Sequence, residues 1–159
     1  MSNKLKNQLM DAVLRENIQE VKKILRDGVD TEDKDRDGRT PLFHAVIDGN
    51  VDLVNKLVEF GANVNLQDKI GKTPLHYAAS GFKVNVAKIL LKKGTIVDVM
   101  DVHGNIPLSD AVFYSKGRGE LIKLLLKYGA NKDLKNYHGI SPIELASSIA
   151  NYDIAKFFR

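Results

Sequence analysis

A repeat of 33 residues limits the fold of this chain before any other feature is considered. Residues 35–42 (DRDGRTPL) return at 68–75 (DKIGKTPL) and, more weakly, at 101–108 (DVHGNIPL) and 136–143 (NYHGISPI). Self-similarity at a fixed period of this length indicates a solenoid built from one repeated supersecondary unit. Such a fold presents an extended surface more often than a pocket. A second glycine series keeps the 33-residue step and lengthens to 35 at its end: Gly28, Gly61, Gly94 and Gly129.

The second copy of the repeat predicts two helices and a projecting loop. Thr40 and Pro41 mark a helix start, because a threonine hydroxyl accepts a backbone amide bond and proline gives up no needed donor at the first helical position. A second helix is expected over about 52–60, where apolar residues follow helical spacing. Gly61 supplies the left-handed residue that ends this helix. Because one unit cannot bury its own apolar faces, the units must stack.

Two segments carry a family resemblance. Residues 71–79 (GKTPLHYAA), together with 60–65 (FGANVN), resemble the ankyrin repeat, and the resemblance covers nearly the whole chain. It implies an all-α repeat solenoid, an ankyrin-like stack of helix-turn-helix units joined by β-hairpin loops, with a concave binding face. It also implies that His76 is a structural histidine bonded to the backbone near a repeat junction.

The repeat divides the chain into five units within a single ankyrin repeat domain, 1–159. The first unit lacks the Thr-Pro-Leu helix start but carries an apolar stripe formed by Leu5, Leu9, Ala12 and Val13, so we expect it to cap the stack. The predicted units are an N-terminal cap at 1–34, central repeats at 35–67, 68–100 and 101–135, and a C-terminal cap at 136–159.

The last unit stops at Phe157 and Phe158, inside the point where its second helix would finish. We expect one of these rings to pack inward against Ile143, Leu145 or Ile154 and the other to stay exposed. A monomer is expected, and a homodimer through the C-terminal end is the alternative.

The fourth unit departs most from the pattern. Ile106 replaces the threonine at the helix start, which removes a capping hydroxyl worth about 1 kcal/mol. Ser109 and Asp110 replace the His-Tyr pair of the third unit. The stretch between the two helices, 113–119, is two residues longer than its counterpart in the second unit. Two interpretations stay open: neutral drift in a tolerant loop, or an insertion that shapes a partner contact.

The sequence offers little chemistry for catalysis or metal binding. It has no cysteine, which excludes disulfides, thiolate catalysis and cysteine-ligated zinc. Residues 33–38 imitate the start of a calcium loop, but Pro41 and His44 stand where the later ligands are required. The four histidines lack metal-binding spacing, the serines lack a nucleophile elbow, and the glycines at 117 and 119 lack the lysine of a phosphate loop. We therefore expect no enzyme, no cofactor and no metal.

Charge and hydropathy favour a cytoplasmic protein. The formal net charge of +4 comes largely from lysines on expected helix exteriors, such as Lys88 and Lys123, which are typical of a solvated convex face. The start of the sequence does not resemble a secretory signal, and no apolar run is long enough for a membrane span. Export by a dedicated secretion system would leave no recognisable mark in such a sequence.

The resemblance also places a partner-binding surface. Proteins of this family bind mainly through the hairpin tips and the inner face of the first helix of each unit. Carried over by register, the partner-binding positions are Arg36, Asp37, Arg39, Ile47, Asp48, Lys69, Ile70, Lys72, Ser80, Met100, Val102, His103, Asn105, Phe113, Tyr114, Tyr137, His138 and Ile140.

This set of positions is charged in its N-terminal third and apolar or aromatic from Ile70 onward. Clustered exposed apolar side chains at loop tips indicate the core of an interface with a polar rim. The alternative is that some of them tuck between neighbouring hairpins.

The expected function is a non-catalytic protein–protein interaction module that binds a protein partner. A stand-alone inhibitor, such as an antitoxin or immunity-type protein, is one concrete version, with a charged rim from Arg36 to Lys72 that complements an acidic partner. The alternatives are a scaffold or adaptor and a secreted bacterial effector. Nucleic-acid binding is less favoured, and would show steep salt dependence.

Overall fold

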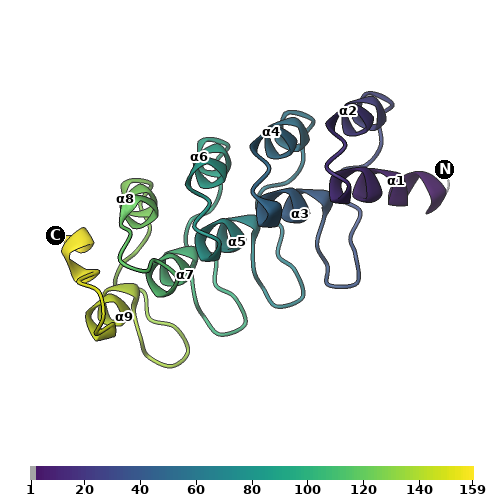
Figure 1. Ribbon diagram of the computed structural model, residues 1–159. Coiled ribbons are helices and arrows are strands. Elements are labelled where there is room, and N and C mark those ends of the chain that lie inside the picture. The colour runs from purple at the N-terminus through teal and green to yellow at the C-terminus, as the bar shows by residue number, and fades with distance from the viewer. Residues whose placement is uncertain (1–2) are drawn as a thin grey trace.

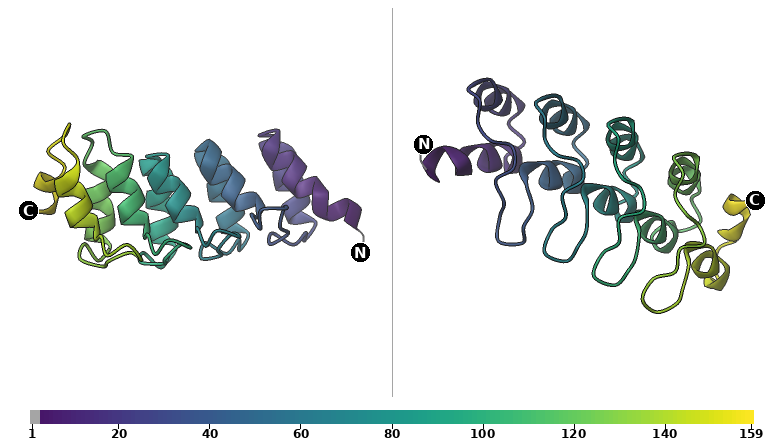
Figure 2. Two further views of the ribbon diagram at one scale, coloured as in Figure 1. Left: turned by 90° about the horizontal axis from the view of Figure 1, so that it is seen from below. Right: turned by 180° about the vertical axis from the view of Figure 1, so that it is seen from behind.

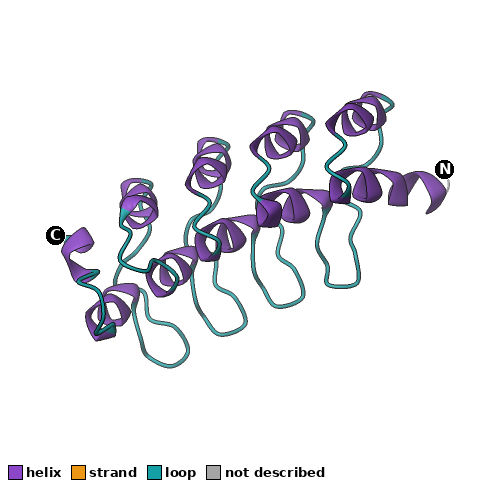
Figure 3. Ribbon diagram, in the orientation of Figure 1, coloured by secondary structure: helices purple, strands orange, loops and turns teal. Residues whose placement is uncertain are grey.

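The structure is a computed structural model that describes the backbone of residues 3–159 and the side chains of residues 8–159. Within this range it is a stack of helix pairs, with a long loop projecting between successive pairs (Figure 1). The loops leave the stack on one side, and the chain ends lie at opposite ends of the stack (Figure 2). No strand is assigned in the described residues, so the expected β-hairpins are hairpin-shaped loops without β-ladders (Figure 3).

Each unit contributes a first helix beside the loops and a second helix on the side away from them (Figure 1). In the part of the chain that is described, no helix is long and apolar enough to cross a membrane. The unit boundaries themselves stay a prediction. The first helices are α1 (Asn3–Leu14), α3 (Pro41–Asp48), α5 (Pro74–Ser80), α7 (Pro107–Phe113) and α9 (Pro142–Ser148). The second helices are α2 (Ile18–Arg26), α4 (Val51–Glu59), α6 (Val84–Lys92), α8 (Glu120–Lys127) and a short 3₁₀ turn, η1 (Ala155–Phe158).

Proline sets the start of every first helix after α1, as the sequence predicts. The predicted cap bond of Thr40 is wrong, because its side chain makes no capping hydrogen bond. Ser141 does cap α9: its hydroxyl accepts from Glu144 N, and the Glu144 carboxylate accepts from Ser141 N at 2.8 Å. Ile106 is fully buried at the equivalent position. Replacing threonine with isoleucine therefore exchanges a hydroxyl for apolar burial, which offsets the expected loss of stability.

The core lies between the row of first helices and the row of second helices. Leu42, Leu75 and Leu108 occupy one repeat position in α3, α5 and α7, and all three are fully buried. Each first helix packs on its neighbours in the row, as α5 does on α3 and α7. The predicted stripe of the first unit is confirmed for Leu9, Ala12 and Val13. Leu5 lies outside the residues whose side chains are described.

The turn of each projecting loop opens with an Asp or Asn residue whose side chain stabilises that turn through backbone hydrogen bonds. The Asp35 carboxylate accepts hydrogen bonds from Asp37 N at 2.8 Å and Arg39 N at 2.9 Å. Asp68 and Asp101 accept the equivalent pairs in their own loops, and Asn136 does so with its amide oxygen. Side chains of this type hydrogen-bond the backbone two residues on and so stabilise turns. The repeated Asp/Asn thus has a structural role that needs no calcium.

Single backbone hydrogen bonds join neighbouring loop tips. Lys69 N donates to Asp37 O at 2.9 Å, and Val102 N donates to Ile70 O at 3.1 Å. The third such bond runs from Tyr137 N to His103 O at 3.1 Å. These bonds align the tips into one continuous surface from the second unit to the fifth.

The C-terminal unit ends in a compact turn. Phe157 and Phe158 are both half-buried and both pack against the core, so the expectation that one ring stays exposed is wrong. The Phe157 ring lies directly on Gly119, where a Cβ atom would come within 2.3 Å of it. The lack of a side chain at Gly119 therefore admits the ring that closes this end of the stack. The oligomeric state stays a prediction.

Candidate functional site

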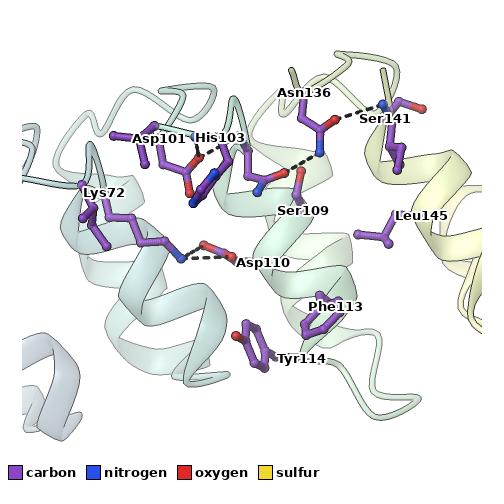
Figure 4. Close-up of a pocket in the computed structure, with 14 residues that line it drawn as sticks. Lys72, Asp101, His103, Ser109, Asp110, Phe113, Tyr114, Asn136, Ser141 and Leu145 are labelled. Atoms are coloured by element: carbon purple, nitrogen blue, oxygen red, sulfur yellow. Dashed lines mark hydrogen bonds and ion pairs between the residues drawn. The ribbon is translucent and has the colours of Figure 1, made fainter. Parts of the chain in front are cut away.

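A cavity of about 420 Å³ opens in the angle between the projecting loops of the third to fifth units and the first helices of the fourth and fifth, α7 and α9 (Figure 4). Its size lies within the range of ligand pockets in proteins. The structure brings eight of the predicted partner-binding residues together around it: Ile70, Lys72, Val102, His103, Asn105, Phe113, Tyr114 and Ile140. Six further residues complete the lining: Asp101, Ser109, Asp110, Asn136, Ser141 and Leu145.

Ten predicted positions lie outside this cavity. Most of them are exposed at loop tips or at the end of a helix, while Ser80 turns its hydroxyl to the carbonyl oxygen of Tyr77 at 3.3 Å. Met100 packs partly against the core. The exposed positions are Arg36, Asp37, Asp48, Lys69, Tyr137 and His138, and the half-buried ones are Arg39, Ile47, Ser80 and Met100.

The apolar part of the surface is strongly exposed. Phe113 is 63% exposed and Tyr114 is 44% exposed, and their rings meet edge to face with centroids 4.9 Å apart. Tyr137 is 70% exposed although its ring lies against Gly104 of the neighbouring loop. This ring therefore touches the adjacent loop while most of its surface remains open to solvent. Exposed aromatic clusters of this kind mark interaction sites.

Arg39 belongs to a network between the second and third units. Its guanidinium donates to the Tyr77 hydroxyl at 2.8 Å and to the Asp68 carboxylate at 3.4 Å. The Tyr77 hydroxyl itself donates to Asp68 at 2.6 Å. Burial, with the bond to Asp68, raises the pKa of Tyr77 to about 12, so the phenol stays protonated at physiological pH. Arg39 was expected to face a partner, and the structure gives it an intramolecular role as well.

Lys72 forms the equivalent link between the third and fourth units. Its ammonium group lies 3.0 and 3.2 Å from the two carboxylate oxygens of Asp110 (Figure 4). Asp110 is buried, and this burial raises the pKa of its carboxyl, although the charge of Lys72 acts in the opposite direction. Two of the predicted rim cations, Arg39 and Lys72, are thus engaged within the chain.

His76 is buried below this surface and joins two units. Its Nδ1 accepts from Thr73 N at 3.0 Å, and its Nε2 lies 3.1 Å from the carbonyl oxygen of Asn105 in the next unit. Because Nδ1 is an acceptor, the ring proton sits on Nε2 and is donated to that carbonyl. Burial lowers the pKa of His76 to about 4, so the ring is neutral at pH 7. The predicted backbone-bonding role is confirmed.

Sequence reasoning missed the polar floor of the cavity. Asp101 and Asn136 fall at the loop-opening position, which the repeat marks as a turn residue and not as a surface residue. Ser109 and Asp110 carried a usable signal, because they break the His-Tyr pattern of the third unit. No group of three or more His, Cys, Asp or Glu side chains within the described residues is placed to hold a metal ion.

Comparison with known proteins agrees with this architecture. The family model for ankyrin repeats (3 copies) matches residues 9–101 and, in an overlapping second match, residues 49–136. No curated protein matches the sequence. The two family matches together cover most of the sequence and include every helix pair from α3–α4 to α7–α8. The chain therefore belongs to the ankyrin repeat family.

Proposed function

We propose that this chain is a non-catalytic protein-binding module whose partner docks on the loops and first helices of the third to fifth units. Ankyrin repeats are generally protein–protein interaction modules and are typically non-catalytic. The observation that carries the proposal is the gathering of exposed apolar and aromatic side chains around one open cavity. We call Ile70, Phe113, Tyr114 and Tyr137 the apolar cluster; the first three line the cavity, and Tyr137 lies beside it on the loop of the fifth unit.

The apolar cluster has the composition of an interface core. Tyrosine and phenylalanine supply large contact areas at low entropic cost, and interface energy is concentrated in a few such side chains. Exposed charged residues of the neighbouring loops, among them Arg36 and Lys69, form a polar rim on the N-terminal side. A surface with an apolar centre and a charged edge supports tight binding to one protein partner.

Within this proposal we favour an inhibitor of the antitoxin or immunity type. A row of loop tips joined by backbone hydrogen bonds forms a firm surface that can cover another protein's working face. Arg36 and Lys69 would meet acidic groups at the edge of that partner. A scaffold or adaptor, or a secreted bacterial effector, would use the same surface to hold two proteins together.

The test is affinity capture from extracts of the source cells, followed by mass spectrometry. Wild type is compared with a variant in which the whole apolar cluster is changed: Ile70→Ala, Phe113→Ala, Tyr114→Ala and Tyr137→Ala. A matched control replaces four apolar residues of similar exposure that lie outside the cavity: Leu14→Ala, Phe60→Ala, Ile96→Ala and Tyr128→Ala.

We expect wild type and control to capture the same protein and the cluster variant to lose it while remaining folded by circular dichroism. Equal capture by all three would show that the partner binds elsewhere. Recovery of nucleic acid, with a steep loss of binding as salt rises, would instead support a nucleic-acid-binding protein.

A further inference from the structure

Three of the four loop-opening residues are aspartates with a second carboxylate oxygen, and in two units a neighbouring side chain binds that oxygen. In the second unit, Asp35 Oδ2 lies 2.8 Å from His44 Nε2. In the third unit, Asp68 Oδ2 accepts from the Tyr77 hydroxyl at 2.6 Å and from Arg39 Nε at 3.4 Å. The partners always come from the same two repeat positions: the fourth residue of the first helix, and the residue that follows the loop turn of the preceding unit.

The fourth unit breaks this arrangement at Asp101. Asp110 occupies the helix position of Tyr77, and an ionised carboxylate has no proton to donate. Lys72 occupies the position of Arg39, but it turns to Asp110 at 3.0 Å. Asp101 still accepts two backbone hydrogen bonds through Oδ1, while Oδ2 has no hydrogen-bond partner among the described residues. Asp101 is only 4% exposed, and it lines the cavity.

The cavity therefore carries an uncompensated negative charge. Two carboxylates line it, Asp101 and Asp110, and Lys72 is the single lysine or arginine in its lining. The pairing of Lys72 with Asp110 leaves the Asp101 charge unmatched. Asp101 Oδ2 is not among the fully buried atoms that lack a hydrogen-bond partner, so a cation that entered the cavity could reach it, and a poorly solvated carboxylate gains from such a partner.

The walls of the cavity suit the apolar part of a long cationic side chain. Phe113 and Tyr114 present exposed aromatic rings below Asp110, on the side away from Asp101 (Figure 4), and Ile140 and Leu145 add aliphatic surface. Aromatic faces attract cations, most often the guanidinium group of arginine. Apolar walls also pack against the methylene stem that carries such a group.

We propose that the cavity receives an arginine side chain of the protein partner, whose guanidinium donates to Asp101 Oδ2 while its methylene stem packs against the apolar walls of the cavity. This inference rests on the proposed function and names the chemistry that its surface selects. The chain itself shows the carboxylate contact one unit earlier, where Arg39 donates to Asp68 Oδ2. Arginine fits better than lysine, because its planar group forms several directed hydrogen bonds.

The test is a titration of the ¹⁵N-labelled chain with N-acetyl-arginine amide, followed by NMR. N-acetyl-citrulline amide, which has a similar shape and no charge, is the comparison probe. The first variant is Asp101→Asn, which keeps the Oδ1 acceptor, as Asn136 does in the fifth unit. Asp35→Asn is the matched control, because it changes the same repeat position outside the cavity.

We expect the arginine probe to shift amide signals around the cavity and to bind Asp101→Asn about tenfold more weakly than wild type and Asp35→Asn. The citrulline probe is expected to bind as weakly as the arginine probe does to Asp101→Asn. Equal binding of both probes to wild type, unchanged binding to Asp101→Asn, or shifts confined to another surface would each overturn the inference.

A second variant keeps the test decisive if Asp101→Asn is poorly folded. Lys72→Arg combined with Asp110→Tyr rebuilds the third-unit network in the fourth unit, so the chain's own guanidinium would fill the site. This variant is expected to lose arginine binding and to stay folded. If it binds the arginine probe as wild type does, the inference is wrong. Capture of the partner by Asp101→Asn at wild-type strength, together with loss by the apolar-cluster variant, would leave the proposed function standing and refute the arginine site alone.

Discussion

Phe82 holds a backbone conformation that ordinarily belongs to glycine. Its φ angle is +52°, in the turn between α5 and α6, and Gly49 has a φ of +78° at the equivalent position of the second unit. A side chain in this region costs about 1–2 kcal/mol. The ring is nevertheless buried, and the Arg118 guanidinium lies 4.0 Å from its centroid. Burial of a phenylalanine is worth about 1.5–3 kcal/mol, which outweighs the strain.

This balance predicts an unusual order of stabilities. Phe82→Ala removes the ring and keeps the strain, and is expected to lower the free energy of unfolding by about 3–5 kcal/mol. Phe82→Gly also removes the ring but relieves the strain, so it is expected to be about 1 kcal/mol more stable than the alanine variant. Urea unfolding measures both. A glycine variant less stable than the alanine variant would show that the backbone at Phe82 is not strained.

At the scale of elements, the loop of the third unit is tied to α7 by the pair Lys72–Asp110. The two side chains are 19% and 10% exposed, so neither is well solvated. Removing one partner from such a pair leaves a poorly solvated charge, and this cost exceeds the net value of the pair. The cost is also unequal, because an unpaired Lys72 can reach water on its flexible stem whereas Asp110 is fixed in the helix.

Lys72→Met is therefore expected to destabilise the chain by about 2–3 kcal/mol, somewhat less than for a fully buried pair. Asp110→Asn is expected to lower the free energy of unfolding by less than about 1 kcal/mol, because it removes the less solvated of the two charges. The double variant is expected to recover most of the loss caused by Lys72→Met. A double-mutant cycle by urea unfolding checks this, and additive losses would contradict the coupling.

Local patterns predict the elements better than the site. Pro41 and Gly61 mark helix ends because proline and glycine act through their own backbone, and the structure places those ends as expected. The cap bond of Thr40 was wrong, since the hydroxyl's geometry depends on packing around it. The sequence predicts part of the cavity lining, because the repeat register places loop-tip residues such as Ile70 on this surface. It does not predict the free oxygen of Asp101, which depends on whether the Lys72 side chain turns to Asp101 or to Asp110. The pairing of Lys72 depends on side-chain packing in three dimensions, which residue spacing alone does not give.

At the scale of the whole molecule, the main helix contacts among the described residues lie within one unit or between neighbouring units, so stability depends on the joints between units. His76 forms one of these joints, because it bonds Thr73 in its own unit and the Asn105 carbonyl in the next. The bond from Thr73 N requires an unprotonated Nδ1, whereas the Nε2 proton is donated to Asn105 in either charge state of the ring. Protonation of His76 would therefore break the bond to Thr73, which holds the ring in place at this joint in the middle of the stack.

The joint at His76 predicts a stability that falls in mild acid. The pKa of His76 is about 4 in the folded chain, against about 6.5 for an unperturbed histidine. Between these values the unfolded chain binds a proton that the folded chain does not, so stability is full above pH 6.5 and declines as the pH falls toward 4. The shift corresponds to about 3 kcal/mol at most.

We expect urea unfolding of wild type to show this decline in the free energy of unfolding. His76→Gln is expected to be less stable at pH 7 and to show a flatter dependence of that free energy on pH over the same range. Other titrating groups act in both proteins, so the difference between the two curves isolates His76. Parallel curves would mean that the buried imidazole is not what couples the stack to pH.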